Sequence, residues 1–189
     1  MTGIDKPWYG EKKRGRPWFR GSAADDAIKR LWSAADKLSG TEGKYLKTVL
    51  LTGKRKTAIA EMKYEQIDDT WFWHAPKPIK QKTNKRLHPI PLPDVVQRIL
   101  HPRRESGDIF PGDKNGRIHV DGHELQGKIR DASGIKNFFL HGVRHMIETK
   151  MAELKVPPHI RDMLFDHAPK RGSGDGYDHH DYRTRWWQR

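Results

Sequence analysis

Hydrophobic positions recur with a helical period along most of the chain, which predicts a mainly helical fold. In the stretch 22–38, one face collects Ala23, Ala27, Leu31 and Trp32. The next stretch ends at Thr52-Gly53, and glycine commonly follows the last residue of a helix. The same reasoning predicts further helices over residues 44–51, 55–65, 93–100, 121–132, 146–154 and 157–165.

The period changes to that of a strand in the middle of the chain. The run Thr70-Trp-Phe-Trp73 is aromatic and β-prone, and it ends before the prolines at 76 and 78. Residues 86–92 fit a returning strand, with a turn at 82–85 between the two. The fold class that follows is α+β, mainly α, a helical bundle with a small antiparallel sheet.

Composition adds a strong charge bias. The chain has 189 residues, a length that is enough for one domain with a real core. Of these residues, 34% are hydrophobic and 32% are charged. The formal net charge is +13, so polyanions are the expected partners, with nucleic acid first. The alternative is a basic but inert surface.

Cysteine content and hydropathy limit the kinds of site and the cellular location that the chain can have. The chain has no cysteine, so it has no disulfide framework and no thiolate metal site. No apolar run approaches the ~20 residues of a membrane span, and the first residues carry no secretory signal. A cytoplasmic, DNA-associated protein is expected.

Residues 1–22 stand apart from the rest in composition. They are rich in Gly, Lys, Arg and Trp without clean periodicity, and we interpret them as a basic arm or linker. This segment is either a flexible tail or an arm that contacts DNA. Residues 23–189 form the expected single domain.

One ordered set of side chains carries the candidate chemistry. Arg55 lies in Leu51-Thr-Gly-Lys-Arg55, and further along the chain come His141-Gly-Val-Arg144, His167 and Tyr177. Two converging guanidinium groups can hold a phosphate through planar, bidentate hydrogen bonds. A phenol beside them could attack that phosphate covalently.

This set resembles the catalytic domain of the tyrosine recombinases, the phage-integrase family. The match runs from about residue 24 to residue 185. No single box is specific, but five in the right order are. The matching segments are Leu51-Thr-Gly-Lys-Arg55, Leu87-His-Pro-Ile-Pro-Leu92, His141-Gly-Val-Arg144-His145, Leu164-Phe-Asp-His167 and Gly176-Tyr177-Asp-His-His-Asp-Tyr182.

The resemblance implies a role for each residue. Arg55 and Arg144 would neutralise the phosphate as its transition state gains charge. Tyr177 would attack phosphorus, with Tyr182 as the alternative nucleophile. His141 would act as an acid or base or steady the phosphate, and His167 would bond a non-bridging oxygen. The leaving 5′ oxygen needs a proton, which a lysine of the β-hairpin would supply: Lys82 fits best, and Lys80 and Lys85 stay open.

Two departures from the family pattern stand out. The family often has an acidic residue three positions after the first arginine, where this chain has Ala58, with Glu61 one turn later. Relatives usually carry a separate N-terminal core-binding domain as well, which residues 1–22 are too few to form. The polar cluster around His179 and His180 lacks the spacing of a helix-borne zinc motif, so we interpret it as a solvated turn.

The function implied is site-specific DNA recombination or integration through a 3′-phosphotyrosyl intermediate, with no metal, nucleotide or other cofactor. The implied partners are double-stranded DNA, other recombinase protomers in a tetramer on that DNA, and accessory DNA-bending proteins. Three alternatives remain at this point. They are a type IB topoisomerase-like strand transferase, a DNA-binding module with a decayed site, and a metal-dependent nuclease.

Overall fold

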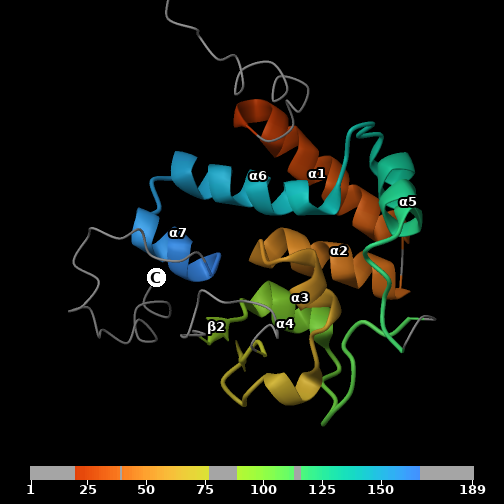
Figure 1. The fold of residues 1–189 in the computed structure, drawn as a ribbon, viewed down its shortest axis with the longest axis vertical. Coiled ribbons are helices and arrows are strands. Elements are labelled where there is room, and N and C mark those ends of the chain that lie inside the picture. Colours follow the sequence, from red (N-terminus) through yellow and green to blue (C-terminus); the bar gives the residue numbers. More distant parts are fainter. Residues whose placement is uncertain (1–19, 39, 77–88, 113–115, 167–189) are drawn as a thin grey trace, which may run out of the picture.

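The fold is mainly helical with one small antiparallel sheet, which confirms the predicted class. The computed structural model describes residues 20–38, 40–76, 89–112 and 116–166. Within these ranges no helix is both long and apolar enough to cross a membrane. The described elements in chain order are α1 (Gly21–Leu38), α2 (Gly40–Thr52), α3 (Lys56–Ala60), the 3-10 helix η2 (Tyr64–Gln66), β1 (Phe72–Trp73), β2 (Ile90–Pro91), α4 (Asp94–Leu100), α5 (His123–Ser133), α6 (Leu140–Glu153) and α7 (Pro158–Leu164) (Figure 1).

The first helix, α1, packs on α2 and α5 through a face of small side chains. Its buried residues are Ala24, Ala27, Leu31, Ala34 and Ala35. Alanines let the helices approach closely, and a Cβ on Gly43 of α2 would lie 2.3 Å from the Ala35 carbonyl oxygen. The predicted face was therefore right for positions 27 and 31 but wrong for position 23, which is exposed.

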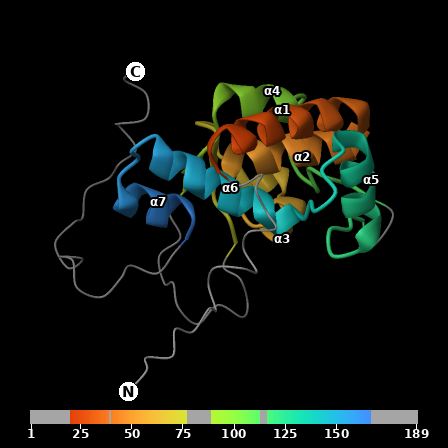
Figure 2. The ribbon, with the colours of Figure 1, turned by 90° about the horizontal axis from the view of Figure 1, so that it is seen from above.

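The second helix, α2, runs through the middle of the helical body. It contacts α1, α3, α4 and α6, and it buries Tyr45, Leu46, Val49 and Leu50. The helices α5 and α7 lie at opposite ends of this body in both views (Figures 1 and 2). The C-terminal end of α2 faces the α7 end, so the turn after α2 lies where α6 and α7 also meet.

Within the described residues, the sheet is shorter than the sequence predicted. Strand β1 pairs with β2 in antiparallel register, Phe72 with Pro91 and Trp73 with Ile90. The strand does not begin at residue 70, because the Asp68 carboxylate accepts hydrogen bonds from the N–H groups of both Thr70 and Phe72 and closes a turn there. The predicted hairpin turn at 82–85 lies outside the described residues.

The single helix predicted over 55–65 is in fact two short ones. The helix α3 ends at Ala60, and Tyr64 opens η2. Between them the chain bonds to another segment instead of continuing the helix: the Tyr64 N–H donates to the Gly107 carbonyl at 3.0 Å, and the Ile109 N–H donates to the Met62 carbonyl at 3.0 Å. The buried side chains of Ile59 and Met62 confirm the predicted inward positions.

Helix α6 begins six residues earlier than the predicted start at Met146. The backbone at Phe139 is extended, and the Leu140 N–H donates to Oε1 of Gln126 on α5 at 3.2 Å. This bond satisfies one of the N–H groups that the first turn of a helix leaves free. The early start matters for the site, because it puts both His141 and Arg144 on the helix.

Candidate active site

Three of the six side chains expected to carry the chemistry lie within the described residues: Arg55, His141 and Arg144. The remaining expected residues and their alternatives lie outside them: Lys82, His167, Tyr177, Lys80, Lys85 and Tyr182. The described part of the site consists of the turn after α2, the start of α6 and the turn after α7 that leads toward residue 167.

The turn after α2 carries Arg55 and depends on Gly53. The Gly53 backbone has φ +60°, in the left-handed region that glycine enters at little cost. Its N–H donates to the Val49 carbonyl at 2.9 Å, which closes the end of the helix as predicted. A Cβ there would lie 3.1 Å from ring carbons of Phe165 and from Cγ2 of Ile147. The glycine therefore also lets the turn pack against α6 and the end of α7.

Arg55 leads directly into α3. Its carbonyl accepts the Ile59 N–H at 3.1 Å, and its side chain is 35% exposed, so a ligand can reach the guanidinium. The neighbouring Lys56 is held at both its backbone and its side chain: its carbonyl accepts the Tyr45 hydroxyl at 2.9 Å, and its Nζ pairs with Asp121 at 2.8 Å. Burial, followed by the charge of Asp121, raises the pKa of Tyr45, so the hydroxyl stays a neutral donor.

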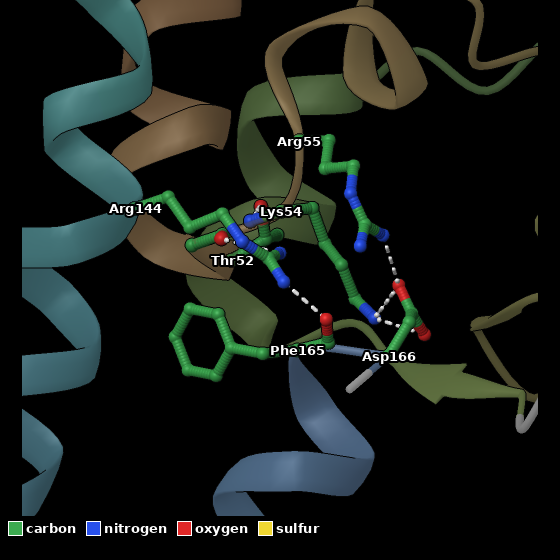
Figure 3. A network of polar contacts seen from close by, with 7 residues as sticks. Thr52, Lys54, Arg55, Arg144, Phe165 and Asp166 are labelled. Carbon is green, nitrogen blue, oxygen red and sulfur yellow. Dashed lines mark hydrogen bonds and ion pairs between the residues drawn. The ribbon is translucent and has the colours of Figure 1, made fainter. Parts of the chain in front are cut away.

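Arg144 joins three segments that are far apart in the sequence. It lies on the first turns of α6 and is only 4% exposed. One terminal nitrogen, Nη1, donates to the Gly53 carbonyl at 3.3 Å, and the other, Nη2, donates to the Phe165 carbonyl. The guanidinium carbon lies 4.7 Å from the centroid of the Phe165 ring, a cation–π contact (Figure 3). The side chain thereby connects the turn after α2 to the turn after α7.

The environment of Arg144 is positive and dry. Burial, followed by the charge of Arg55, lowers the pKa of Arg144 to about 10, so it keeps its charge at neutral pH. A guanidinium has five N–H donors in a fixed planar fork. It can therefore hold two backbone carbonyls and still offer N–H groups to an anion.

Lys54 and Asp166 are functional candidates that the sequence reasoning missed. The side chain of Lys54 is only 2% exposed, and its Nζ lies 3.0 Å and 3.1 Å from the two Asp166 carboxylate oxygens. Oδ2 of the same carboxylate lies 3.5 Å from Nη1 of Arg55 (Figure 3). Both residues lie within segments that match the family pattern, yet nothing in the local sequence signals that they pair across 112 positions.

The carboxylate that contacts Arg55 is therefore not one of those near it in sequence. Ala58, at the position where the family often has an acid, is partly buried. Glu61 pairs with Arg117 at 3.3 Å, in a contact that does not involve Arg55. Asp166 reaches Arg55 from the end of α7. Ala58 cannot orient Arg55 as an acidic residue there would, and the Asp166 carboxylate contacts Arg55 instead.

His141 lies three residues before Arg144, so the two share one face of α6. The residue is exposed, and its ring stands edge-on to that of His145 with centroids 4.8 Å apart. Desolvation by the surrounding protein, then the charges of His145, Arg144 and Arg55, lowers the pKa of His141. The imidazole is therefore neutral at pH 7 and can accept a proton or a hydrogen bond.

The arrangement can bind and polarise an oxyanion. Arg55 and Arg144 bring two permanent positive charges close together, and a neutral imidazole lies on the same helix as the second. Within the described residues, no three His, Asp or Glu side chains come together in a group that could hold a metal ion. A phosphate group matches the charge and the planar donors of this site.

The comparison with known proteins finds a distant relationship to an integrase. No family model matches the chain. Prophage integrase IntF of Escherichia coli (strain K12) is 27% identical to it over 164 residues, which cover 78% of this chain and 34% of that protein. The chain thus spans about a third of the length of the relative that it matches. This likeness supports an integrase-like relationship.

Proposed function

We propose that this chain is the catalytic part of a tyrosine-type site-specific DNA recombinase, which cuts and rejoins DNA through a 3′-phosphotyrosyl intermediate. The observation that carries the proposal is the convergence of Arg55 and Arg144 on consecutive residues of one turn. Arg144 bonds the Phe165 carbonyl and Arg55 contacts the Asp166 carboxylate. That turn leads directly to His167, a third residue of the proposed site.

The two arginines would supply the main catalytic effect. A phosphodiester repels nucleophiles because it is negatively charged, and its pentacoordinate transition state carries more charge on the equatorial oxygens. Fixed guanidinium groups stabilise that charge without reorganising at the moment of reaction. The net formal charge of +13 would bring DNA to the site through its phosphates.

Tyr177 would be the nucleophile. Its hydroxyl gives up a proton, which the neutral imidazole of His141 would accept, and its oxygen forms a bond to phosphorus. The bond from phosphorus to the 5′ oxygen breaks, and Lys82 protonates the leaving oxygen, with Lys80 and Lys85 as alternatives. His167 would bond a non-bridging oxygen. Attack by a 5′ hydroxyl reverses every step, so rejoining needs no ATP.

The wider proposals follow from this chemistry. Residues 23–189 would form the catalytic domain, and residues 1–22 a basic arm or linker. Strand exchange needs two duplexes, so the working form would be a tetramer of protomers on DNA, together with accessory DNA-bending proteins.

Covalent trapping tests the proposal. Wild type, Tyr177→Phe and Tyr182→Phe would be incubated in EDTA with supercoiled plasmid and with a nicked duplex, then resolved on a denaturing gel. We expect a protein–DNA adduct from wild type and Tyr182→Phe and none from Tyr177→Phe. Loss of the adduct in Tyr182→Phe alone would move the nucleophile to that residue. No adduct from wild type, with DNA bound in the same tubes, would contradict the proposed reaction.

Salt dependence gives a separate check on the DNA partner. If binding rests on phosphate contacts, affinity for duplex DNA should fall by roughly a hundredfold or more between about 50 mM and 200 mM salt. An affinity that changes less than about threefold over that range would contradict a polyanion-binding surface.

A further inference from the structure

We propose that the Lys54–Asp166 ion pair is a positioning device for Arg55: Lys54 fixes the Asp166 carboxylate, and Asp166 fixes the guanidinium. The inference deepens the proposed function and rests on it for its catalytic consequence. Neither residue would touch the substrate, and both would act through Arg55.

The burial of Lys54 is the first argument. A lysine side chain is almost never fully buried unless it is paired, yet that of Lys54 is 2% exposed. Burial lowers the pKa of Lys54, and the charge and hydrogen bonds of Asp166 act in the opposite direction. An ammonium held this way cannot turn toward water. Because it contacts both carboxylate oxygens, it leaves the carboxylate little freedom to rotate.

The shape of the turn after α7 is the second argument. Asp166 has φ +49°, in the left-handed region that aspartate enters more readily than most residues other than glycine. The preceding residue, Phe165, gives its carbonyl to Arg144, while Asp166 gives its carboxylate to Arg55. Two consecutive residues therefore hold the two arginines, and the separation of the guanidinium groups depends on where Asp166 is held.

Charge balance is the third argument. A carboxylate beside a phosphate site would normally repel the substrate. Lys54 offsets that charge, so the four side chains Lys54, Arg55, Arg144 and Asp166 still carry two net positive formal charges (Figure 3). The pair can thus orient Arg55 without cancelling the attraction for an anion.

Three variants separate positioning from stability. Asp166→Asn removes the charge that holds Arg55 and leaves Lys54 buried without its counter-ion. Lys54→Met/Asp166→Asn removes both charges, so the fold keeps no unpaired ammonium there. The matched control is Asp36→Asn, which breaks the Lys47–Asp36 pair, a contact that involves neither arginine.

The readouts are the NMR signal of the Arg55 Nε–H group, assigned by its loss in Arg55→Lys, and the single-turnover rate of adduct formation on a nicked duplex at saturating DNA. In both Asp166 variants we expect the Arg55 signal to move toward that of a free guanidinium. We expect adduct formation to slow by about tenfold to a hundredfold, with DNA affinity changed less than about threefold. The control should match wild type in both.

Two results would overturn the proposal. One is an Arg55 signal that stays in place in the Asp166 variants. The other is a double variant that recovers the wild-type rate together with its stability, which would mean that the pair serves folding only. If wild type forms no adduct but the Arg55 signal moves, the proposed reaction fails while the positioning of Arg55 by Asp166 stands.

Discussion

Arg144 binds Phe165 twice: its guanidinium donates to the Phe165 backbone carbonyl and lies 4.7 Å from the centroid of the same residue's ring. The carbonyl contact fixes the direction of the side chain, and the ring covers one face of it. These two contacts stabilise the charge of a side chain that is only 4% exposed, so Arg144 can stay positive within a site for an anion.

Replacing Arg144 with lysine should damage the site although the charge is kept. An ammonium is a point charge and cannot span the carbonyls of Gly53 and Phe165 as the planar fork does. We expect Arg144→Lys to slow adduct formation by about a hundredfold or more and to cost about 1 to 3 kcal/mol of unfolding free energy. Single-turnover kinetics and urea unfolding measure the two effects. A rate within threefold of wild type would contradict the role given to the guanidinium.

Gly53→Ala should disturb the site more than a matched change elsewhere. Ala would have to adopt φ +60° and place its Cβ 3.1 Å from the Phe165 ring, so we expect a loss of about 2 to 4 kcal/mol. The matched control is Gly134→Ala, at the end of α5 with φ +67°, where the Cβ meets only the flexible end of Arg30. Urea unfolding and adduct formation would be measured for both.

The control should lose less stability, about 1 to 2 kcal/mol, and keep the wild-type rate of adduct formation. If the two glycine variants behave alike in both measurements, the close approach of the Gly53 turn to Phe165 does not matter for stability or for adduct formation.

The protonation of His141 should show the positive surroundings of the site. Desolvation and the nearby His145, Arg144 and Arg55 lower its pKa from the usual 6.5, so its NMR titration midpoint should lie below that value. As pH falls below 6.5 the unfolded chain takes up this proton before the folded one does. The contribution of His141 to stability is therefore flat above 6.5 and decreases as pH falls toward the folded pKa.

His145→Ala checks the cause, because removing the edge-on ring should raise the His141 midpoint. A wild-type midpoint at or above 6.5 would contradict the assigned environment, and so would a midpoint that His145→Ala leaves in place.

Tyr45→Phe should destabilise the turn after α2 that carries Arg55. The change removes the hydroxyl that donates to the Lys56 carbonyl at 2.9 Å and should cost about 1 to 2 kcal/mol. Tyr64→Phe is the matched control, since the Tyr64 hydroxyl donates to the Leu100 carbonyl at 3.3 Å, a bond that involves no residue of the turn after α2. We expect both variants to lose stability in thermal unfolding, and only Tyr45→Phe to slow adduct formation. Equal rates in the two variants would mean that the turn does not depend on this bond.

The sequence predicted what depends on neighbouring residues. The stop of α2 at Gly53 and the inward positions of Ile59 and Met62 follow from local periodicity and from the conformational freedom of glycine. The early start of α6 was missed because it depends on a hydrogen bond from Leu140 to Gln126 of another helix. Contacts of that kind leave no trace in a short window of sequence.

The same limit applies to the site. The box pattern picked out Arg55 and Arg144, which the fold does bring to one turn. The Lys54–Asp166 pair was not predicted, because it depends on two turns that meet only in the folded chain. The carboxylate that contacts Arg55 comes from Asp166, 111 positions further along the chain, which no spacing rule would have indicated.

The most direct test of the proposed mechanism is to identify the residue that becomes linked to DNA. The adduct formed by wild type on a nicked duplex would be digested with protease and nuclease, and the nucleotide-bearing peptide would be sequenced by mass spectrometry. We expect a nucleotide joined to the Tyr177 oxygen through its 3′ phosphate. A nucleotide on any other residue, Tyr182 included, would contradict the assigned nucleophile, and a protein that binds the duplex without forming a linkage would contradict the phosphotyrosyl mechanism.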